Sequence, residues 1–131
     1  MSLFRSINAS SSGLSVQRTR MDVIADNIAN AETTRTPDGG AYRRLRVLVS
    51  ASDGPDGGVQ VMGVTPDDTP MKKVFDPSHP DARADGYVEL PNVDIATEMV
   101  DMIAASRAYE ANAKALSLAR GMLHDAIDIL S

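Results

Sequence analysis

The sequence predicts a mainly α-helical protein with a small β insertion, in which long N- and C-terminal helices pair as a coiled-coil-like hairpin. One observation is the distribution of helix-breaking residues. All 7 prolines of the 131-residue chain lie between Pro37 and Pro91, and only Gly13 and Gly121 of the 9 glycines lie outside that stretch. Long helices therefore suit only the two ends. The other observation is a seven-residue spacing of apolar residues at both ends, which is typical of helices that supercoil around each other.

The first of three segments, residues 1–34, is expected to form an N-terminal helix. Its apolar row has members seven positions apart: Ile7, Leu14, Met21 and Ile28. Such a row keeps one face of the helix against a partner helix. We expect the helix to begin near Ser2 and to fray between Asn30 and Thr34, with Gly13 as a weak point of about 1 kcal/mol relative to alanine.

The last segment, residues 92–131, carries a longer version of the same pattern. Its main row is Ile95, Met102, Tyr109, Leu116, Leu123 and Leu130, and its alternate row is Met99, Ala113 and Ile127. Pro91 prevents the helix from extending backward, and Asn92 is the expected N-cap. Asp94 and Glu98 lie in the first turns, where carboxylates favour the positive end of the helix dipole.

The middle segment, residues 35–91, is expected to be β-rich. Residues 42–49 alternate, with Leu45, Val47 and Val49 on one face, and a turn in 52–58 leads to a partner strand in 59–64. Residues 71–75 and 87–90 are weaker strand candidates. The three segments together form one structural unit.

The C-terminal helix has more apolar surface than one partner helix can cover. A second stripe contains Ala96, Val100 and Ile103, and a third contains Ala111, Ala115, Leu118, Met122, Ala126 and Ile129. A two-helix hairpin covers each helix on one side only, so the stripes indicate packing between subunits.

Composition excludes several classes of function. The net charge of -5 argues against nucleic-acid binding, and the absence of cysteine excludes thiolate metal sites and cysteine nucleophiles. No window approaches 18 consecutive apolar residues, so we expect no membrane span. The first residues contain neither an unbroken apolar run nor a small-residue cleavage site, so we expect no cleaved signal peptide.

No residue is predicted to be catalytic, cofactor-binding or metal-binding. Residues 81–86 resemble the start of a calcium loop but have Arg83 and Asn92 where ligands belong, so a plain turn is the better interpretation. His124 and Asp128 could share an ion, but two ligands do not make a site. The basic run of Arg43, Arg44 and Arg46 has two open interpretations: a surface for an acidic partner, or a solvated strand face.

Three parts of the chain resemble one known family. Residues 21–33 (MDVIADNIANAET) resemble the N-terminal signature of the flagellar rod, hook and hook-associated axial proteins. Residues 92–94, 98–103 and 106–112 look like the matching C-terminal signature. Residues 37–43 and 76–88 are similar to the proximal-rod members of that family, and Asp26 stands where many relatives have asparagine.

The resemblance implies a structural subunit of the basal-body proximal rod, which polymerises through its terminal helices into the axial drive shaft that transmits torque. It implies that the chain lies in the periplasm-spanning rod of the flagellum and is exported by the flagellar type III apparatus without a cleaved signal. The implied partners are copies of itself, other rod proteins and the base proteins that join the rod to the membrane ring. The alternative is a finite coiled-coil adaptor, and an enzyme is the least favoured class.

The predicted subunit interface combines the apolar rows with asparagines of the matched signatures. Its members are Ile7, Leu14, Met21, Ile24, Asn27, Ile28, Asn30, Ile95, Met99, Met102, Ile103, Tyr109, Asn112, Leu116, Leu123, Ile127 and Leu130.

Overall fold

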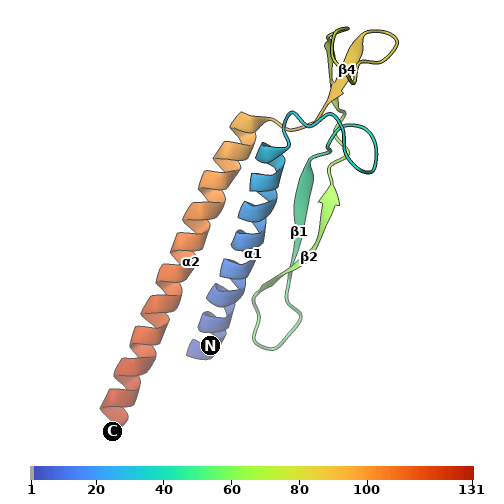
Figure 1. Cartoon of the computed structure of the whole chain (residues 1–131). Helices are drawn as coiled ribbons and strands as arrows, with labels where there is room; N and C mark the ends of the chain where they lie inside the picture. Colours follow the sequence, from blue (N-terminus) through green and yellow to red (C-terminus); the bar gives the residue numbers. More distant parts are fainter. Residues whose placement is uncertain (1) are drawn as a thin grey trace.

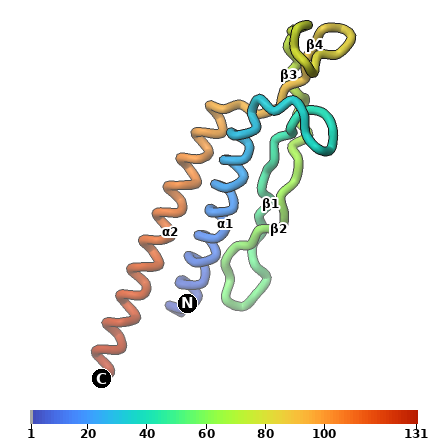
Figure 2. Tube along the Cα trace, in the orientation of Figure 1, coloured from blue at the N-terminus to red at the C-terminus, as the bar shows by residue number. Residues whose placement is uncertain are grey.

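A computed structural model describes residues 2–131 and contains two long helices with two β-hairpins between them. The elements in chain order are α1 (Leu3–Ala29), β1 (Leu45–Ala51), β2 (Val59–Pro66), β3 (Lys72–Phe75), β4 (Tyr87–Leu90) and α2 (Ile95–Leu130). The two helices lie side by side and run in opposite directions, and the β1–β2 hairpin runs along α1 (Figures 1 and 2). This architecture confirms the predicted helical hairpin with a small β part.

The helix ends follow local capping rules. The Ser2 hydroxyl accepts a hydrogen bond from the Arg5 backbone N–H at 3.2 Å, and α1 ends at Ala29, as expected. The expected N-cap of α2 is wrong. Asp94 caps the helix by accepting from the Ala96 backbone N–H at 3.1 Å, because the Asn92 side chain is used in the tertiary contacts described below.

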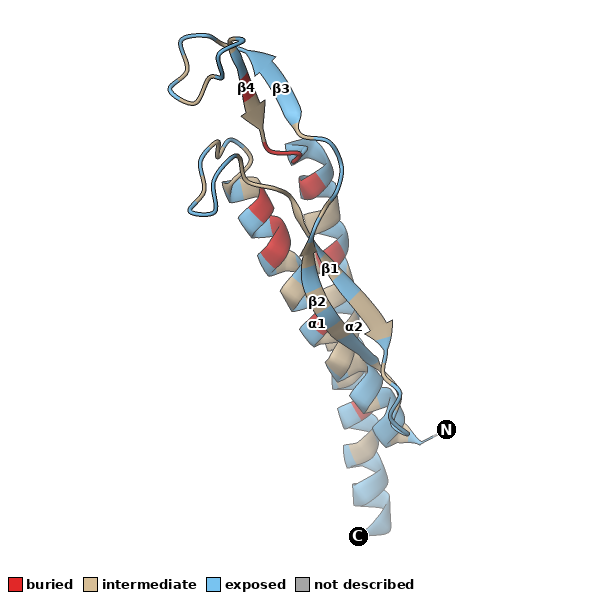
Figure 3. Ribbon diagram, turned by 90° about the vertical axis from the view of Figure 1, so that its right-hand side faces the viewer, coloured by how far each residue is buried: buried red, intermediate tan, exposed pale blue. Residues whose placement is uncertain are grey.

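Both hairpins are antiparallel two-stranded sheets. In the β1–β2 hairpin a β-bulge shifts the register between Leu48 and Val49. The β3–β4 hairpin extends beyond the helices, and all four residues of β3 are exposed (Figure 3). Phe75 and Tyr87 face each other across this hairpin, with ring centroids 5.2 Å apart in an edge-to-face arrangement. All four predicted strands are present; the 87–90 strand matches at both ends, and the boundaries of the other three differ by at most three residues.

The contact between the helices uses one predicted row of α2 and a different second row. The main-row residues Met102, Tyr109, Leu116 and Leu123 are half-buried. Met99 and Ile127 of the predicted alternate row are 55% and 57% exposed, whereas Ala113 is half-buried, so contact of this row with another subunit stays a prediction. The second row that faces α1 has small or polar members, which apolar periodicity does not detect: Glu98, Ala105, Asn112 and Ala119.

Gly13 allows the helices to approach closely. A Cβ atom at this position would lie 2.8 Å from Nδ2 of Asn112. The residue predicted to be a weak point in α1 is therefore also a packing position, at which a side chain would displace Asn112 or separate the helices.

The turn of the β1–β2 hairpin is attached to α1. The Val59 backbone N–H donates to the Ser12 hydroxyl at 3.1 Å, and the Asn8 side-chain amide donates to the Gly57 carbonyl at 3.2 Å. Gly58 has φ of +101°, and a Cβ atom there would lie 2.6 Å from Oγ of Ser12. Both the backbone conformation and the short approach therefore require glycine.

We expect Gly58→Ala to lower the free energy of unfolding by about 1–3 kcal/mol, because it combines backbone strain with a steric clash. Chemical denaturation of the purified chain measures this. Gly63→Ala is the matched control: Gly63 lies in β2, has no positive φ and has nothing within 4 Å of the added Cβ. Equal effects of the two changes would contradict the proposed role of Gly58.

Candidate assembly interface

A cluster of hydrogen-bonded polar side chains joins the two helices to the β1–β2 hairpin. We call this cluster the polar junction; its members are Asn27, Tyr42, Arg44, Asp67, Asn92 and Glu98. It lies where α1 ends, β1 begins and α2 begins, so it controls how these three elements are placed relative to one another.

Asn27 of α1 pairs with the backbone of β1 as another strand would. Its Nδ2 donates to the Leu45 carbonyl at 2.8 Å, and its Oδ1 accepts from the Leu45 N–H at 2.9 Å. The Tyr42 hydroxyl donates to the same Oδ1 at 2.8 Å. Asn27 is 1% exposed, so these partners replace water for a buried amide.

Glu98 of α2 is fully buried and pairs with Arg44. The Arg44 guanidinium donates from Nε to Oε1 of Glu98 and from Nη1 to Oδ2 of Asp67 at 2.9 Å, and its Nη2 lies 3.7 Å from the Asp101 carboxylate. A buried carboxylate is costly unless it is paired and hydrogen-bonded. The hydrogen bond that Arg44 donates to Glu98 raises the pKa of Arg44 above its usual value. Desolvation, reinforced by the negative charges of Asp26 and Glu98, raises the pKa of Tyr42.

Asn92 and Arg43 hold the chain that leaves β2. The Asn92 Oδ1 accepts from the Arg44 backbone N–H at 2.7 Å, and its Nδ2 donates to the carbonyls of Asp67 and Thr69 at 3.1 and 2.9 Å. Arg43 Nη1 donates to the same two carbonyls. These bonds place the end of β2 beside the segment that precedes α2.

The three arginines of the basic run have different roles in the structure. Arg43 and Arg44 make contacts within the subunit, whereas Arg46 is exposed and has no ion-pair partner among residues 2–131. An alternating strand pattern assigned Arg44 and Arg46 to one face but could not show that Arg44 reaches a carboxylate 54 residues away.

The two metal-site candidates contain short polar contacts. The Asp81 carboxylate accepts from the Thr34 hydroxyl at 2.6 Å and from Arg35, and these bonds lower the pKa of Asp81. Nδ1 of His124 and Oδ2 of Asp128 are 3.1 Å apart on an exposed face of α2. Within residues 2–131, no three His, Asp or Glu side chains lie together as a metal site would require, and no helix is long and apolar enough to cross a membrane.

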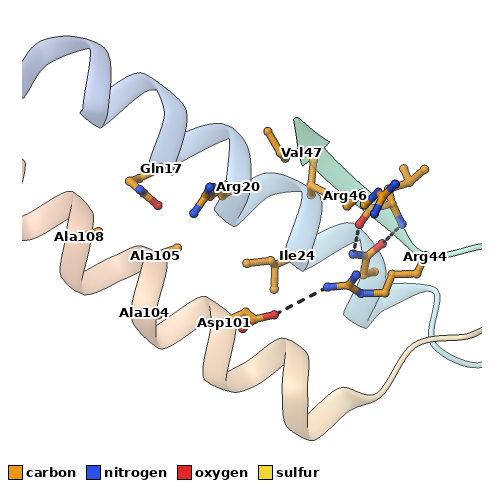
Figure 4. A pocket seen from close by; sticks show the side chains of 13 residues that line it. Gln17, Arg20, Ile24, Arg44, Arg46, Val47, Asp101, Ala104, Ala105 and Ala108 are labelled. Carbon is orange, nitrogen blue, oxygen red and sulfur yellow. Dashed lines mark hydrogen bonds and ion pairs between the residues drawn. The ribbon is translucent and has the colours of Figure 1, made fainter. Parts of the chain in front are cut away.

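A groove lies between α1, α2 and β1 beside the polar junction, with a volume of about 320 Å³ (Figure 4). Its apolar lining includes Val23, Ile24 and Ala105. Arg20 of α1 and Arg46 of β1 add positive charge at its sides, and neither has an ion-pair partner within the described residues. We call this feature the basic groove.

The residues predicted to contact other subunits fall into two groups. Ile24 and Asn27 are buried, and most of the others are half-buried within the subunit: Ile7, Leu14, Met21, Ile28, Asn30, Met102, Tyr109, Asn112, Leu116 and Leu123. The exposed group consists of Ile95, Met99, Ile103, Ile127 and Leu130. Further exposed apolar residues of α2 are Val100, Leu118, Met122 and Ile129. Contact with a neighbouring subunit stays a prediction for both groups.

The chain matches two family profiles and several curated proteins. Residues 7–35 match the profile described as flagella basal body rod protein, and residues 84–129 match the C-terminal profile of the flagellar basal body rod FlgEFG proteins. The flagellar basal-body rod protein FlgC of Borreliella burgdorferi is 45% identical, with 99% of each chain covered. FlgC of Bacillus subtilis is 40% identical over 98% of this chain and 99% of its own.

The chain belongs to the FlgC family of flagellar basal-body rod proteins. FlgC of Salmonella typhimurium is 39% identical over 94% of both chains. Family membership confirms the expected structural rod subunit. The matched profile regions contain Asn27 and Glu98, so the polar junction connects the two parts of the chain that carry the family signature.

We expect Asn27→Ala to lower the free energy of unfolding by about 3 kcal/mol, because it leaves the Leu45 N–H and carbonyl and the Tyr42 hydroxyl without their partner. Asn8→Ala is the control, since it removes an exposed amide on the same helix, and we expect it to cost less than about 1 kcal/mol. Chemical denaturation measures the free energy of unfolding of both variants. Equal decreases would show that Asn27 stabilises the fold no more than an exposed asparagine does.

Asp67 makes stability depend on pH. Hydrogen bonds lower the pKa of Asp67 from 3.8 to about 2. The largest effects come from the side chain and backbone of Thr69, and a smaller one comes from Arg44. A depressed carboxyl pKa contributes stability that is complete above the unfolded value and is lost as pH falls through the folded value. We expect this part of the stability to disappear between about pH 4 and pH 2. Thermal unfolding of Asp67→Asn should show a shallower decline over that range, and identical profiles would contradict the assignment.

Proposed function

We propose that this chain is a proximal-rod subunit that polymerises through α1 and α2 into the axial shaft of the flagellum and transmits torque. The observation that carries the proposal is the exposed apolar face of α2. Val100, Ile103, Leu118 and Met122 are 56–64% exposed within the subunit. Large exposed apolar surfaces of this kind are typical of protein interfaces.

The length difference between the helices supports the same proposal. α2 has 36 residues and α1 has 27, and every residue after Leu123 is exposed. The end of α2 therefore extends past the start of α1 without a partner in the subunit (Figure 1). An isolated helix end gains most of its stability from packing, so this segment is suited to contact with another chain.

The proposed partners are copies of this chain, other rod proteins and the base proteins that join the rod to the membrane ring. The flagellar type III apparatus would export the chain, without a cleaved signal, to the periplasm-spanning rod. We infer no catalytic activity, since the relatives are rod proteins and the polar junction serves to hold the fold together. A finite coiled-coil adaptor stays the second candidate, because the same exposed face could bind a single helix.

Leu118→Asp should abolish rod assembly and motility, because it places a charge in an apolar contact between subunits. The test is complementation of a flagellated bacterium that lacks its own copy of this gene, with circular dichroism to verify the fold. Met62→Asp is the control: Met62 is 63% exposed, much as Leu118 is at 64%, but lies in β2.

Normal motility with Leu118→Asp would contradict an interface on α2. Electron microscopy of the purified chain at high concentration separates the two candidates, since open assembly gives filaments and an adaptor gives complexes of fixed size. Fixed-size complexes would favour the adaptor.

A further inference from the structure

We propose that the C-terminal end of α2 of one subunit docks in the basic groove of a second copy of this chain. The inference rests on the proposed function and names one contact through which copies associate. We call the docking segment the acidic tip; it comprises residues 124–130.

The acidic tip has an uncompensated negative charge. It contains Asp125 and Asp128, and no Lys or Arg lies after Arg120. The last turn of α2 has no basic residue, so the negative end of the helix dipole is not balanced within the helix. His124 lies 3.1 Å from Asp128 but is charged only when protonated, whereas Asp125 has no partner among residues 2–131.

The basic groove carries three arginines (Arg20, Arg44 and Arg46) and one carboxylate, Asp101, which lies 3.7 Å from Arg44. Arg44 is occupied by Glu98 and Asp67, which leaves Arg20 and Arg46 as the groove's two cations without carboxylate partners. The guanidinium of Arg20 extends into the space between α1 and α2 (Figure 4). Two unpaired arginines beside a groove match two carboxylates on a helix end.

The apolar surfaces also match. Ile127, Ile129 and Leu130 of the acidic tip are 57%, 83% and 87% exposed, and the groove of about 320 Å³ has an apolar lining. That volume is at the lower end of the range for binding pockets, which suits a few aliphatic side chains rather than a whole helix. Docking would remove these side chains from water while the carboxylates pair with Arg20 and Arg46.

The occupant has to be a different copy. On α2 the groove-lining residues lie between 101 and 108, about 20 residues or 30 Å along the helix from the acidic tip, so a straight helix cannot place its own tip there. The contact joins two different surfaces, so a chain of such contacts always has one free groove at one end and one free tip at the other. Contacts of this heterologous kind generate open assemblies.

Charge reversal tests the contact in solution. One variant carries Arg20→Glu and Arg46→Glu in the groove, and the other carries Asp125→Arg and Asp128→Arg in the tip. We expect each variant alone to associate at least about tenfold more weakly than the wild type in sedimentation experiments, because like charges then face each other. An equimolar mixture should recover association, since each groove then meets a tip of opposite charge. The control reverses Arg18 and Lys114, two exposed cations outside the groove, and should associate normally.

The absence of cysteine makes a crosslinking test clean. We expect Ala108→Cys in the groove of one copy to form a disulfide with Ile129→Cys in the tip of a differently tagged copy, whereas Met62→Cys should not pair with Ile129→Cys. If the wild type associates, but charge reversal does not weaken association and the two cysteines form no disulfide, the tip–groove contact is wrong and the proposed function still stands. If the wild type does not associate at any concentration, both are contradicted.

Discussion

The buried Glu98–Arg44 pair, together with Asn27, is the constraint on which the rest of the structure depends. Glu98 has no access to water, so it can be buried only where Arg44 and Asn27 reach it. Those residues come from α2, β1 and α1, and a slip of any one element would leave a charge or an amide unpaired. Apolar contacts between long helices tolerate small shifts, whereas this set of directional bonds specifies one arrangement. We infer that the polar junction fixes the register of the helix pair and the position of the hairpin.

That register decides which surfaces remain for other subunits. With Glu98, Ala105, Asn112 and Ala119 buried or half-buried beside the main row, a second set of large apolar residues, which includes Val100, Ile103, Leu118 and Met122, is left exposed on α2. Small residues in the contact between the helices, Ala105 and Ala119 on α2 and Gly13 on α1, allow close packing. α2 is therefore apolar on the side that faces α1 and also on an exposed side, whereas a self-sufficient helical hairpin has one apolar side per helix.

The helices, the strands and the main α2 row could be predicted from the sequence because they depend on local signals: periodicity, proline and glycine placement, and capping. The polar junction could not. Glu98 has the sequence position of a first-turn carboxylate and Asn92 that of an N-cap, yet both are used by partners 54 and 48 residues away along the chain. The second row of α2 that faces α1 could not be predicted for a related reason, since glutamate, asparagine and alanine give little apolar signal. Polar pairs between distant parts of the chain leave little trace in the spacing of apolar residues. A carboxylate on the side of a helix that packs against another helix, such as Glu98, does indicate that a buried partner is needed.

Residue-resolved hydrogen exchange of the wild type and of Glu98→Gln tests the central claim most directly. The substitution keeps the shape of the side chain and removes its charge. If the polar junction fixes the register, the amides of Arg44 and Leu45, which donate to Asn92 and Asn27, should lose protection together with amides along both helices. Loss of protection confined to the first turn of α2, with Arg44, Leu45 and α1 unchanged, would show that the helices and the hairpin hold their arrangement without the buried pair.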